Sequence, residues 1–272
     1  HGRAARYERL CAAIMRERPE VVLLGGDILP HAFHSANLPN FIRDYLCVKL
    51  RQLRKHMGND YPKILLILGN DDPRTEEGNV LAESSADLLD YIHGKRLPVA
   101  AFDFYGYACV PPTPFQLKDW ERYDVSRYVP PGSISPEEGF RSVEVPEHEI
   151  KWGTIDKDLE SLVCDACLAH AIFLFHTPPY DTPLDLAQLD GQSYDHVPLD
   201  PHVGSIAVRR FIERRQPLMS LHGHIHESAR LSGEWKTRIG RTVCVTAAHD
   251  GPELAMVRFD PERPADATRE LL

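Results

Sequence analysis

The sequence has no long hydrophobic run. Its apolar runs, such as residues 21–24, 64–68 and 171–175, have only a few residues, whereas a membrane-spanning helix needs ~20. The chain also opens with polar and basic residues, without the apolar stretch of a secretory signal. We therefore expect no membrane segment and no membrane partner.

Cysteine is scarce too, with six in 272 residues, and the chain is large enough to fold without disulfides. Cys164 and Cys167 form a lone C-x-x-C, which burial or coincidence explains better than a metal or redox site because no second pair accompanies it. This cysteine usage favours a reducing, cytoplasmic location.

Basic residues are fewer than acidic ones. The chain has 31 Lys and Arg and 40 Asp and Glu, which give a formal net charge of −9. Non-specific binding to nucleic acid depends on Lys and Arg, so a nucleic-acid partner is disfavoured. The remaining composition, 43% hydrophobic with 17 Gly and 22 Pro, excludes disordered and collagen-like classes. Because the sequence shows no internal repeat and no domain boundary, we predict a single domain over residues 1–272.

Helical and strand patterns alternate along the chain, which predicts a parallel sheet with helical crossovers. The predicted helices are residues 6–18, 38–57, 80–93, 155–168 and 205–215. The predicted strands are residues 21–24, 64–68, 171–175, 218–221, 242–247 and 254–259, with a hairpin formed by 99–102 and 107–110. Residues 111–157 are rich in proline and carry Trp120 and Trp152, which indicates an ordered but irregular insertion.

Histidine is abundant, with 14 residues, and several histidines follow the predicted strands. Four apolar strands end in short polar clusters, and sites in α/β folds form at the carboxyl ends of strands. The donors in these clusters are Asp27, Asn70, His176, His224 and His226. Oxygen and nitrogen donors without a thiolate suit Mn, Fe or Zn in a catalytic site and disfavour a structural zinc site.

The ordered clusters resemble the calcineurin-like metallophosphoesterases, whose blocks are D-x-H, G-D, G-N-H-D, H and G-H-x-H. The corresponding residues here are His1-Gly2, Gly26-Asp27, Gly69-Asn70, His176 and Gly223-His224-Ile225-His226. The likeness covers nearly the whole chain, and the passage from His202 to Ser228 is similar to the Icc-related branch of predicted phosphoesterases.

This resemblance implies an α/β fold, a four-layer α/β/β/α sandwich of two mixed sheets flanked by helices. It also implies two divalent ions that activate a bridging hydroxide for attack on phosphorus. One ion would take His1, Asp27 and His226, together with the family's first aspartate. The other would take Asp27, Asn70, His176 and His224, so that Asp27 bridges both.

The sequence departs from the family pattern at two points. The chain starts at His1 and lacks the family's first aspartate, so we expect a short native segment to precede it. Asp71 stands where many members carry a histidine that assists the leaving group. Asp71 could serve as the acid only with a pKa raised well above ~3.9, which favours diesters or activated monoesters.

Two further candidates lie close to the metal ligands in the pattern. Asp72 is expected to orient the ligands. His202 precedes a helix, where it could approach a substrate phosphate; capping of that helix by Ser205 is an equal alternative. His31 and His34 could line the cleft, and His222 is expected mainly to pack.

The function that fits best is hydrolysis of a small phosphoester, with diesters ahead of monoesters. Two alternatives stay open: a nuclease on single-stranded nucleic acid, and a catalytically silent scaffold of the same fold that binds protein. The pattern specifies neither the substrate nor the oligomeric state.

Overall fold

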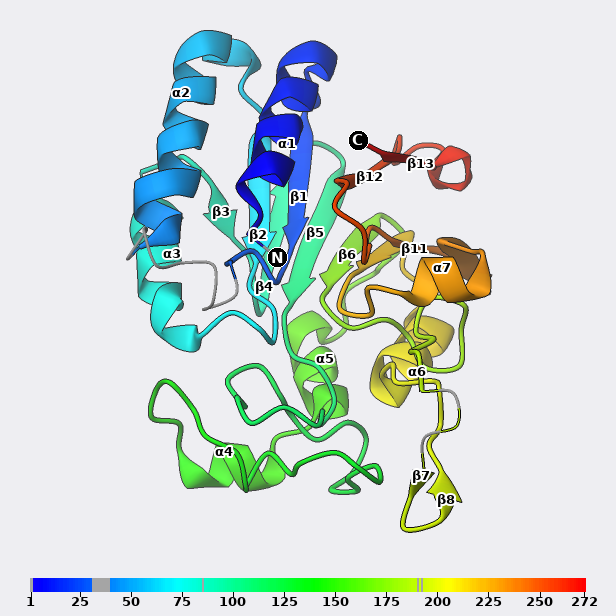
Figure 1. Cartoon of the computed structure of the whole chain (residues 1–272). Helices are drawn as coiled ribbons and strands as arrows, with labels where there is room; N and C mark the ends of the chain where they lie inside the picture. Colours follow the sequence, from blue (N-terminus) through cyan, green and yellow to red (C-terminus); the bar gives the residue numbers. More distant parts are fainter. Residues whose placement is uncertain (1, 31–39, 85, 190, 192) are drawn as a thin grey trace.

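The computed structural model describes residues 2–30, 40–84, 86–189, 191 and 193–272 (Figure 1). A first sheet has three parallel strands in the order β1-β2-β3. Its strands are β1 Val21–Gly25, β2 Lys63–Ile67 and β3 Asp90–Tyr91.

A second sheet has six strands in the order β10-β11-β9-β6-β5-β4. The four inner strands run parallel, and the edge strands β10 and β4 pair antiparallel. Their bounds are β4 Lys95–Val99, β5 Phe102–Tyr107, β6 Ala171–Phe175, β9 Met219–His222, β10 Lys236–Ile239 and β11 Thr242–Thr246. The sheet is therefore mixed.

The alternation of side chains along β6 shows how the layers stack. Leu174 points to the first sheet, where a Cβ on Gly25 would lie 3.5 Å from its Cδ1. Phe173 and Phe175 point the other way and meet Phe211 edge-on, with ring centroids 5.1 and 6.2 Å apart. A strand buried on both faces explains the continuous apolar run in the sequence.

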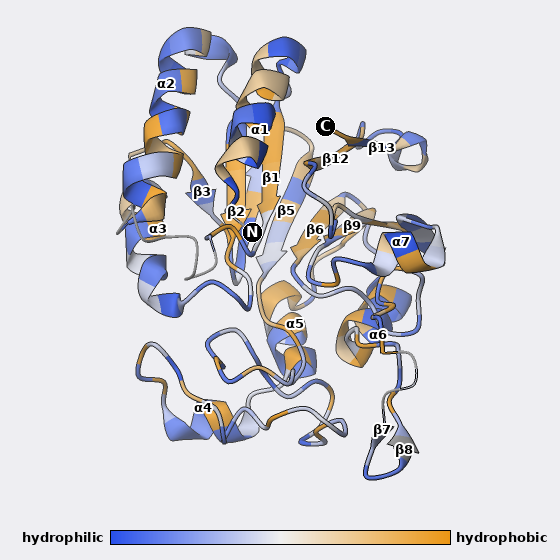
Figure 2. Cartoon of the chain, in the orientation of Figure 1, coloured by the Kyte–Doolittle hydropathy of each residue, from blue (hydrophilic) through white to orange (hydrophobic). Residues whose placement is uncertain are grey.

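Helices cover the outer faces of both sheets. Helices α1 (Ala4–Glu17), α2 (Cys47–Met57) and α3 (Glu77–Ser84) lie on the side of the first sheet, and a π-helical turn, Ile42–Leu46, leads into α2. Helices α5 (Ile155–Val163) and α6 (Ile206–Arg215) lie on the side of the second (Figure 1). Figure 2 shows the apolar residues concentrated in the strands and the polar ones on the outer helix faces. The four-layer α/β sandwich expected from the resemblance is confirmed.

The helix predicted over residues 155–168 ends earlier, at Val163. Two further predicted elements are also wrong in their boundaries. The helix predicted over residues 80–93 ends at Ser84, and the chain then forms β3, which pairs with the free edge of β2. The hairpin is β4 with β5, and it turns at Ala100, whose φ is 52°. Pairing with a neighbouring strand outweighed local propensity in both places.

The insertion at residues 111–157 contains one helix, α4 Glu147–Trp152, and runs into the start of α5. Trp120 is 1% exposed and donates its indole N–H to the Asp72 carbonyl at 2.7 Å, so it anchors the insertion to the loop after β2. Trp152 is 53% exposed, so it does not anchor the insertion as the buried Trp120 does.

Several small elements complete the fold. They are the 3₁₀ turns Gly58–Asp60, Arg74–Glu76 and Pro264–Asp266, the hairpin of β7 Ser193–Tyr194 and β8 Val197–Pro198, helix α7 Ser228–Ser232, and the hairpin of β12 Ala255–Arg258 and β13 Thr268–Leu271. Among the described residues, no helix combines the length and the apolar character that crossing a membrane requires.

Candidate metal centre

Asp27 leaves β1 through an unusual backbone turn. Gly26 has a φ of 94° and Asp27 a φ of 51°. This left-handed region is open to glycine and tolerated by aspartate. A Cβ on Gly26 would lie 2.5 Å from His176 Nδ1 and 2.9 Å from the Leu68 carbonyl oxygen. The turn therefore needs glycine at position 26 for both its conformation and its space.

Gly69 brings the loop after β2 against Asp27. A Cβ on Gly69 would overlap Asp27 and lie 2.6 Å from His176 Cε1. The Asp71 N–H donates to Asp27 Oδ1 at 3.0 Å and holds the two loops together. The carboxyl ends of β1 and β2 thus deliver Asp27 and Asn70 to one point.

His176 follows β6 and reaches the same point from the second sheet. Its Nδ1 lies 2.8 Å from the Gly25 carbonyl oxygen, which can only accept, so Nδ1 carries a proton. Its Nε2 lies 3.0 Å from Asn70 Oδ1 and 3.3 Å from Asp27 Oδ2. If the imidazole is neutral, the lone pair of Nε2 faces the oxygens of Asn70 and Asp27, and these three atoms repel one another. A positive charge among them relieves this repulsion.

The segment after β9 supplies the last two donors. His224 has a φ of 67°, and its ring lies 5.3 Å from that of His176, centroid to centroid. One donor atom from each of Asp27, His176 and His224 lies within 4.8 Å of the others. His226 Nε2 lies 3.9 Å from Asp27 Oδ2, so this carboxylate faces two imidazoles.

The electrostatics match what a cation needs. Burial lowers the pKa of His224 to about 3 and that of His226 to about 4, so both are neutral at pH 7 and keep a lone pair for a ligand bond. Burial also opposes charge on Asp27 and His176, but their mutual attraction wins. It lowers the pKa of Asp27 and raises that of His176. Asp27 and His176 therefore favour positive charge between them.

The spacing fits a metal ion as well. Neighbouring ligands of an octahedral ion with bonds of about 2.1 Å lie roughly 3.0 Å apart. The distances of 3.0 and 3.3 Å from His176 Nε2 to Asn70 and Asp27 agree with this spacing. The residues present therefore suit a divalent ion bound by Asp27, Asn70, His176 and His224.

Asp72 lies beneath the ligands and is completely buried. Its carboxylate accepts hydrogen bonds from the N–H groups of Ile28, Leu29 and Gly69 at 3.0, 2.9 and 2.9 Å. Burial and the charge of Asp27 raise its pKa to about 7. These contacts support the expected role of orienting the ligand loops.

Asp71 is partly exposed beside the ligands, and Asn70 Nδ2 donates to its Oδ1 at 3.1 Å. This bond fixes the Asn70 amide with its oxygen toward His176. The role of Asp71 in proton transfer stays a prediction.

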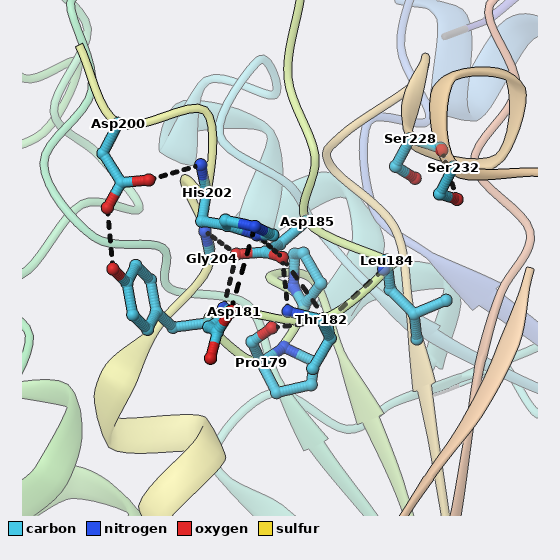
Figure 3. A network of polar contacts seen from close by, with 12 residues as sticks. Pro179, Asp181, Thr182, Leu184, Asp185, Asp200, His202, Gly204, Ser228 and Ser232 are labelled. Carbon is cyan, nitrogen blue, oxygen red and sulfur yellow. Dashed lines mark hydrogen bonds and ion pairs between the residues drawn. The ribbon is translucent and has the colours of Figure 1, made fainter. Parts of the chain in front are cut away.

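His202 lies in a separate polar network (Figure 3). Its Nδ1 lies 2.8 Å from Oδ1 of the buried Asp185, which also accepts from the N–H groups of Thr182 and Gly204 at 2.9 and 3.0 Å. The Nε2 atom of His202 lies 3.9 Å from Asp181. His202 was expected to approach a phosphate at the N-terminus of α6. Other residues of the chain already cap that N-terminus and would compete with a phosphate for its N–H groups.

Sequence reasoning missed this cap. Ser205 accepts from Val208 N–H at 3.0 Å, as expected, but Asp124 of the insertion also accepts from the N–H groups of Ile206 and Ala207 at 2.7 and 3.2 Å. No sequence signal joins Asp124 to α6, because the two are far apart in the chain.

The remaining candidates divide into two groups. His1, His31 and His34 lie outside the described residues. His222 is buried, stacks on Phe175 with ring centroids 5.7 Å apart, and bonds Thr177 and Ser220, so it packs as expected.

Comparison with known protein families identifies the family of this chain. A family model described as calcineurin-like phosphoesterase matches residues 1–228. The chain belongs to the calcineurin-like phosphoesterase family. Members of this family are metal-dependent phosphoric ester hydrolases that generally use two divalent ions.

Solved structures agree with this family fold. One crystal structure shares 18% identity with this phosphoesterase at a TM-score of 0.57, covering 99% of this chain and 95% of the other. The TT1561 protein of Thermus thermophilus shares 16% identity at a TM-score of 0.54, with coverage of 98% and 92%. No curated protein matches the chain.

Proposed function

We propose that this phosphoesterase hydrolyses a small phosphodiester or an activated phosphomonoester at a centre of two divalent ions. Asp27 would bridge the ions, with Asn70, His176 and His224 on one and His226 and His1 on the other. Manganese, iron and zinc all suit this mixture of carboxylate, amide and imidazole donors. Such ions would activate water as the nucleophile and withdraw charge from the phosphoryl oxygens.

The observation that carries the proposal is the convergence of two oxygens on His176 Nε2, which lies 3.0 Å from Asn70 Oδ1 and 3.3 Å from Asp27 Oδ2. These residues come from three strands in two sheets, and two glycines without space for a Cβ permit the approach. A fold that only bound protein would have no need for this close packing of electron-rich atoms.

The chain's own residues prepare the site for this chemistry. The Gly25 carbonyl fixes the proton of His176 on Nδ1 and leaves Nε2, which faces Asn70 and Asp27, as the atom that would bind an ion. Asp72 holds both ligand loops by their backbone N–H groups. Asp71 adds a carboxylate where many relatives carry a histidine, so protonation of a poor leaving group is weak and diesters with good leaving groups are favoured.

The proposed setting is the cytoplasm. The six cysteines are free, which fits a reducing compartment.

The test compares metal content and hydrolysis in the wild type and in Asp27→Asn, with Asp260→Asn as a matched change on the surface. We expect about two Mn, Fe or Zn ions per wild-type chain, and hydrolysis of bis(p-nitrophenyl) phosphate faster than of p-nitrophenyl phosphate. Asp27→Asn should lose metal and at least 10²-fold in rate, while Asp260→Asn keeps both.

Other outcomes would contradict the proposal. A wild-type chain that binds no metal, or that hydrolyses neither ester, would point to a silent scaffold. Salt-sensitive cleavage of single-stranded oligonucleotides in preference to both esters would point to a nuclease.

A further inference from the structure

A cavity of about 40 Å³ lies where the insertion meets the loop after β2. Arg74 borders it from that loop, His93 from the segment after β3, and Trp120, Arg122 and Arg141 from the insertion. Trp120 forms a wall: the Arg74 guanidinium stands over its ring at 5.3 Å, and the His93 ring meets it edge-on at 5.0 Å. The cavity is thus distinct from the candidate metal centre but shares the loop that carries Asp72.

The lining is rich in cations, and its carboxylates already have partners. Four basic side chains and three acidic ones border the cavity. Asp119 accepts from the Arg74 N–H at 2.7 Å and from Ser142 at 2.8 and 2.5 Å. Glu121 pairs with Lys118 at 2.6 Å, both fully buried, and Glu149 pairs with Arg122 at 3.4 Å.

Of the four basic side chains that border the cavity, Arg141 alone has no ion pair among the described residues, since Arg74 pairs with Glu77 at 3.2 Å. Within the part of the chain that the structure describes, the Arg141 guanidinium has one hydrogen bond, from Nη1 to the Pro136 carbonyl at 2.8 Å, and no carboxylate within 4.0 Å. Burial lowers its pKa, and the positive charges of Arg122 and Arg74 lower it further against the pull of Asp119 and Glu121. An anion in this cavity would relieve this repulsion.

His93 adds a neutral donor. Its Nδ1 accepts from the Ala108 N–H at 3.0 Å, so the proton sits on Nε2. Burial and the nearby Arg74 and Arg122 charges lower its pKa to about 3, which keeps the ring neutral. His93 borders the cavity, and its Nε2–H has no hydrogen-bond partner among the described residues.

We propose that this cavity binds a phosphate group through Arg141, Arg74 and the Nε2–H of His93. One water molecule needs roughly 10–15 Å³ of cavity volume. The cavity volume of about 40 Å³ is therefore enough for the three or four oxygens of a phosphate. Planar guanidinium groups bind phosphate through paired hydrogen bonds. The group could belong to free phosphate or to a second phosphate on the substrate, and the latter case rests on the proposed function.

The test is calorimetric titration of the chelator-treated, metal-free chain with inorganic phosphate at constant ionic strength. We expect one site whose affinity falls about tenfold or more in Arg141→Gln, and falls less in Arg141→Lys. Arg127→Gln removes an equal charge from the same insertion, outside the cavity, and should bind like the wild type. Far-ultraviolet circular dichroism checks that each variant is folded.

Absence of binding to the metal-free wild type, or equal losses in Arg141→Gln and Arg127→Gln, would overturn the proposal. These results do not depend on catalysis, so they leave the proposed function untouched.

A second measurement on the metal-loaded enzyme separates the two sources. A rise in KM in Arg141→Gln that is confined to a diester with an additional phosphate assigns the cavity to the substrate. If KM is unchanged for both kinds of diester, while added phosphate alters the wild-type rate and not the Arg141→Gln rate, the cavity belongs to free phosphate.

Discussion

The carboxylate of Asp124 accepts a hydrogen bond of 2.5 Å from the hydroxyl of Ser205, 81 residues further along the chain. It also accepts from the Ile206 N–H at 2.7 Å, so the insertion supplies a cap to helix α6. The insertion and this helix are therefore coupled in stability, although they look independent in the sequence.

Removing this cap should weaken the whole fold. We expect Asp124→Ala to lower the free energy of unfolding by about 1–2 kcal/mol, because the first N–H groups of α6 lose their acceptor. Urea denaturation measures the change, with exposed Asp165→Ala as the control. A change no larger than that of the control would mean that water replaces the carboxylate without loss.

The two glycines Gly69 and Gly78 should respond oppositely to the same substitution. In Gly69→Ala the new Cβ would overlap Asp27, and metal content should fall together with stability. In Gly78→Ala the Cβ meets nothing within 4 Å inside helix α3, so stability should rise by up to about 1 kcal/mol. Elemental analysis and thermal melting check both; equal behaviour of the two variants would contradict the close packing at Asp27.

Asp72→Ala tests whether the buried carboxylate holds the ligand loops. Three N–H groups would lose their acceptor, which should lower the free energy of unfolding by about 2–4 kcal/mol. Metal affinity should fall as well. The effect would be indirect, because the three hydrogen bonds of Asp72 go to backbone N–H groups and not to the side chains of the proposed ligands. Urea denaturation and metal titration measure the two effects, and a stable variant with full metal content would refute the role.

Acid should destabilise the chain partly through His93. The pKa of His93 in the folded chain is about 3, below the ordinary value of 6.5. As the pH falls below 6.5, His93 therefore becomes protonated in the unfolded chain but stays neutral in the folded chain. Stability is therefore complete above pH 6.5 and declines below it, by at most about 1.4 kcal/mol per pH unit for this group.

The measurement is urea denaturation at pH 7.5, 6 and 5 in phosphate-free buffer. His93→Gln should decline less steeply than the wild type, whereas the exposed control His56→Gln should follow it. Parallel curves for His93→Gln and the wild type would show that His93 does not carry this effect.

The sequence predicts the parts of the fold that depend on local pattern. Continuous apolar runs mark strands such as β6, because both faces are buried, and the polar residues that follow them meet at one edge of the sheets. The turn at Ala100 gives no such signal, since nothing in an Ala-Ala pair indicates a positive φ. The cavity at Arg141 could not be predicted either, because it forms between segments whose packing depends on the tertiary structure.

Trp120 is one of three tryptophans in the chain, and it is 1% exposed where Trp152 is 53% exposed. Its indole N–H donates to the carbonyl of Asp72, the Arg74 guanidinium lies over its ring, and the His93 ring meets it edge-on. A buried indole emits at shorter wavelength than an exposed one, and its emission responds to nearby charge. The protein thus carries its own optical probe, in contact with both the loop beneath the proposed metal ligands and the cationic cavity.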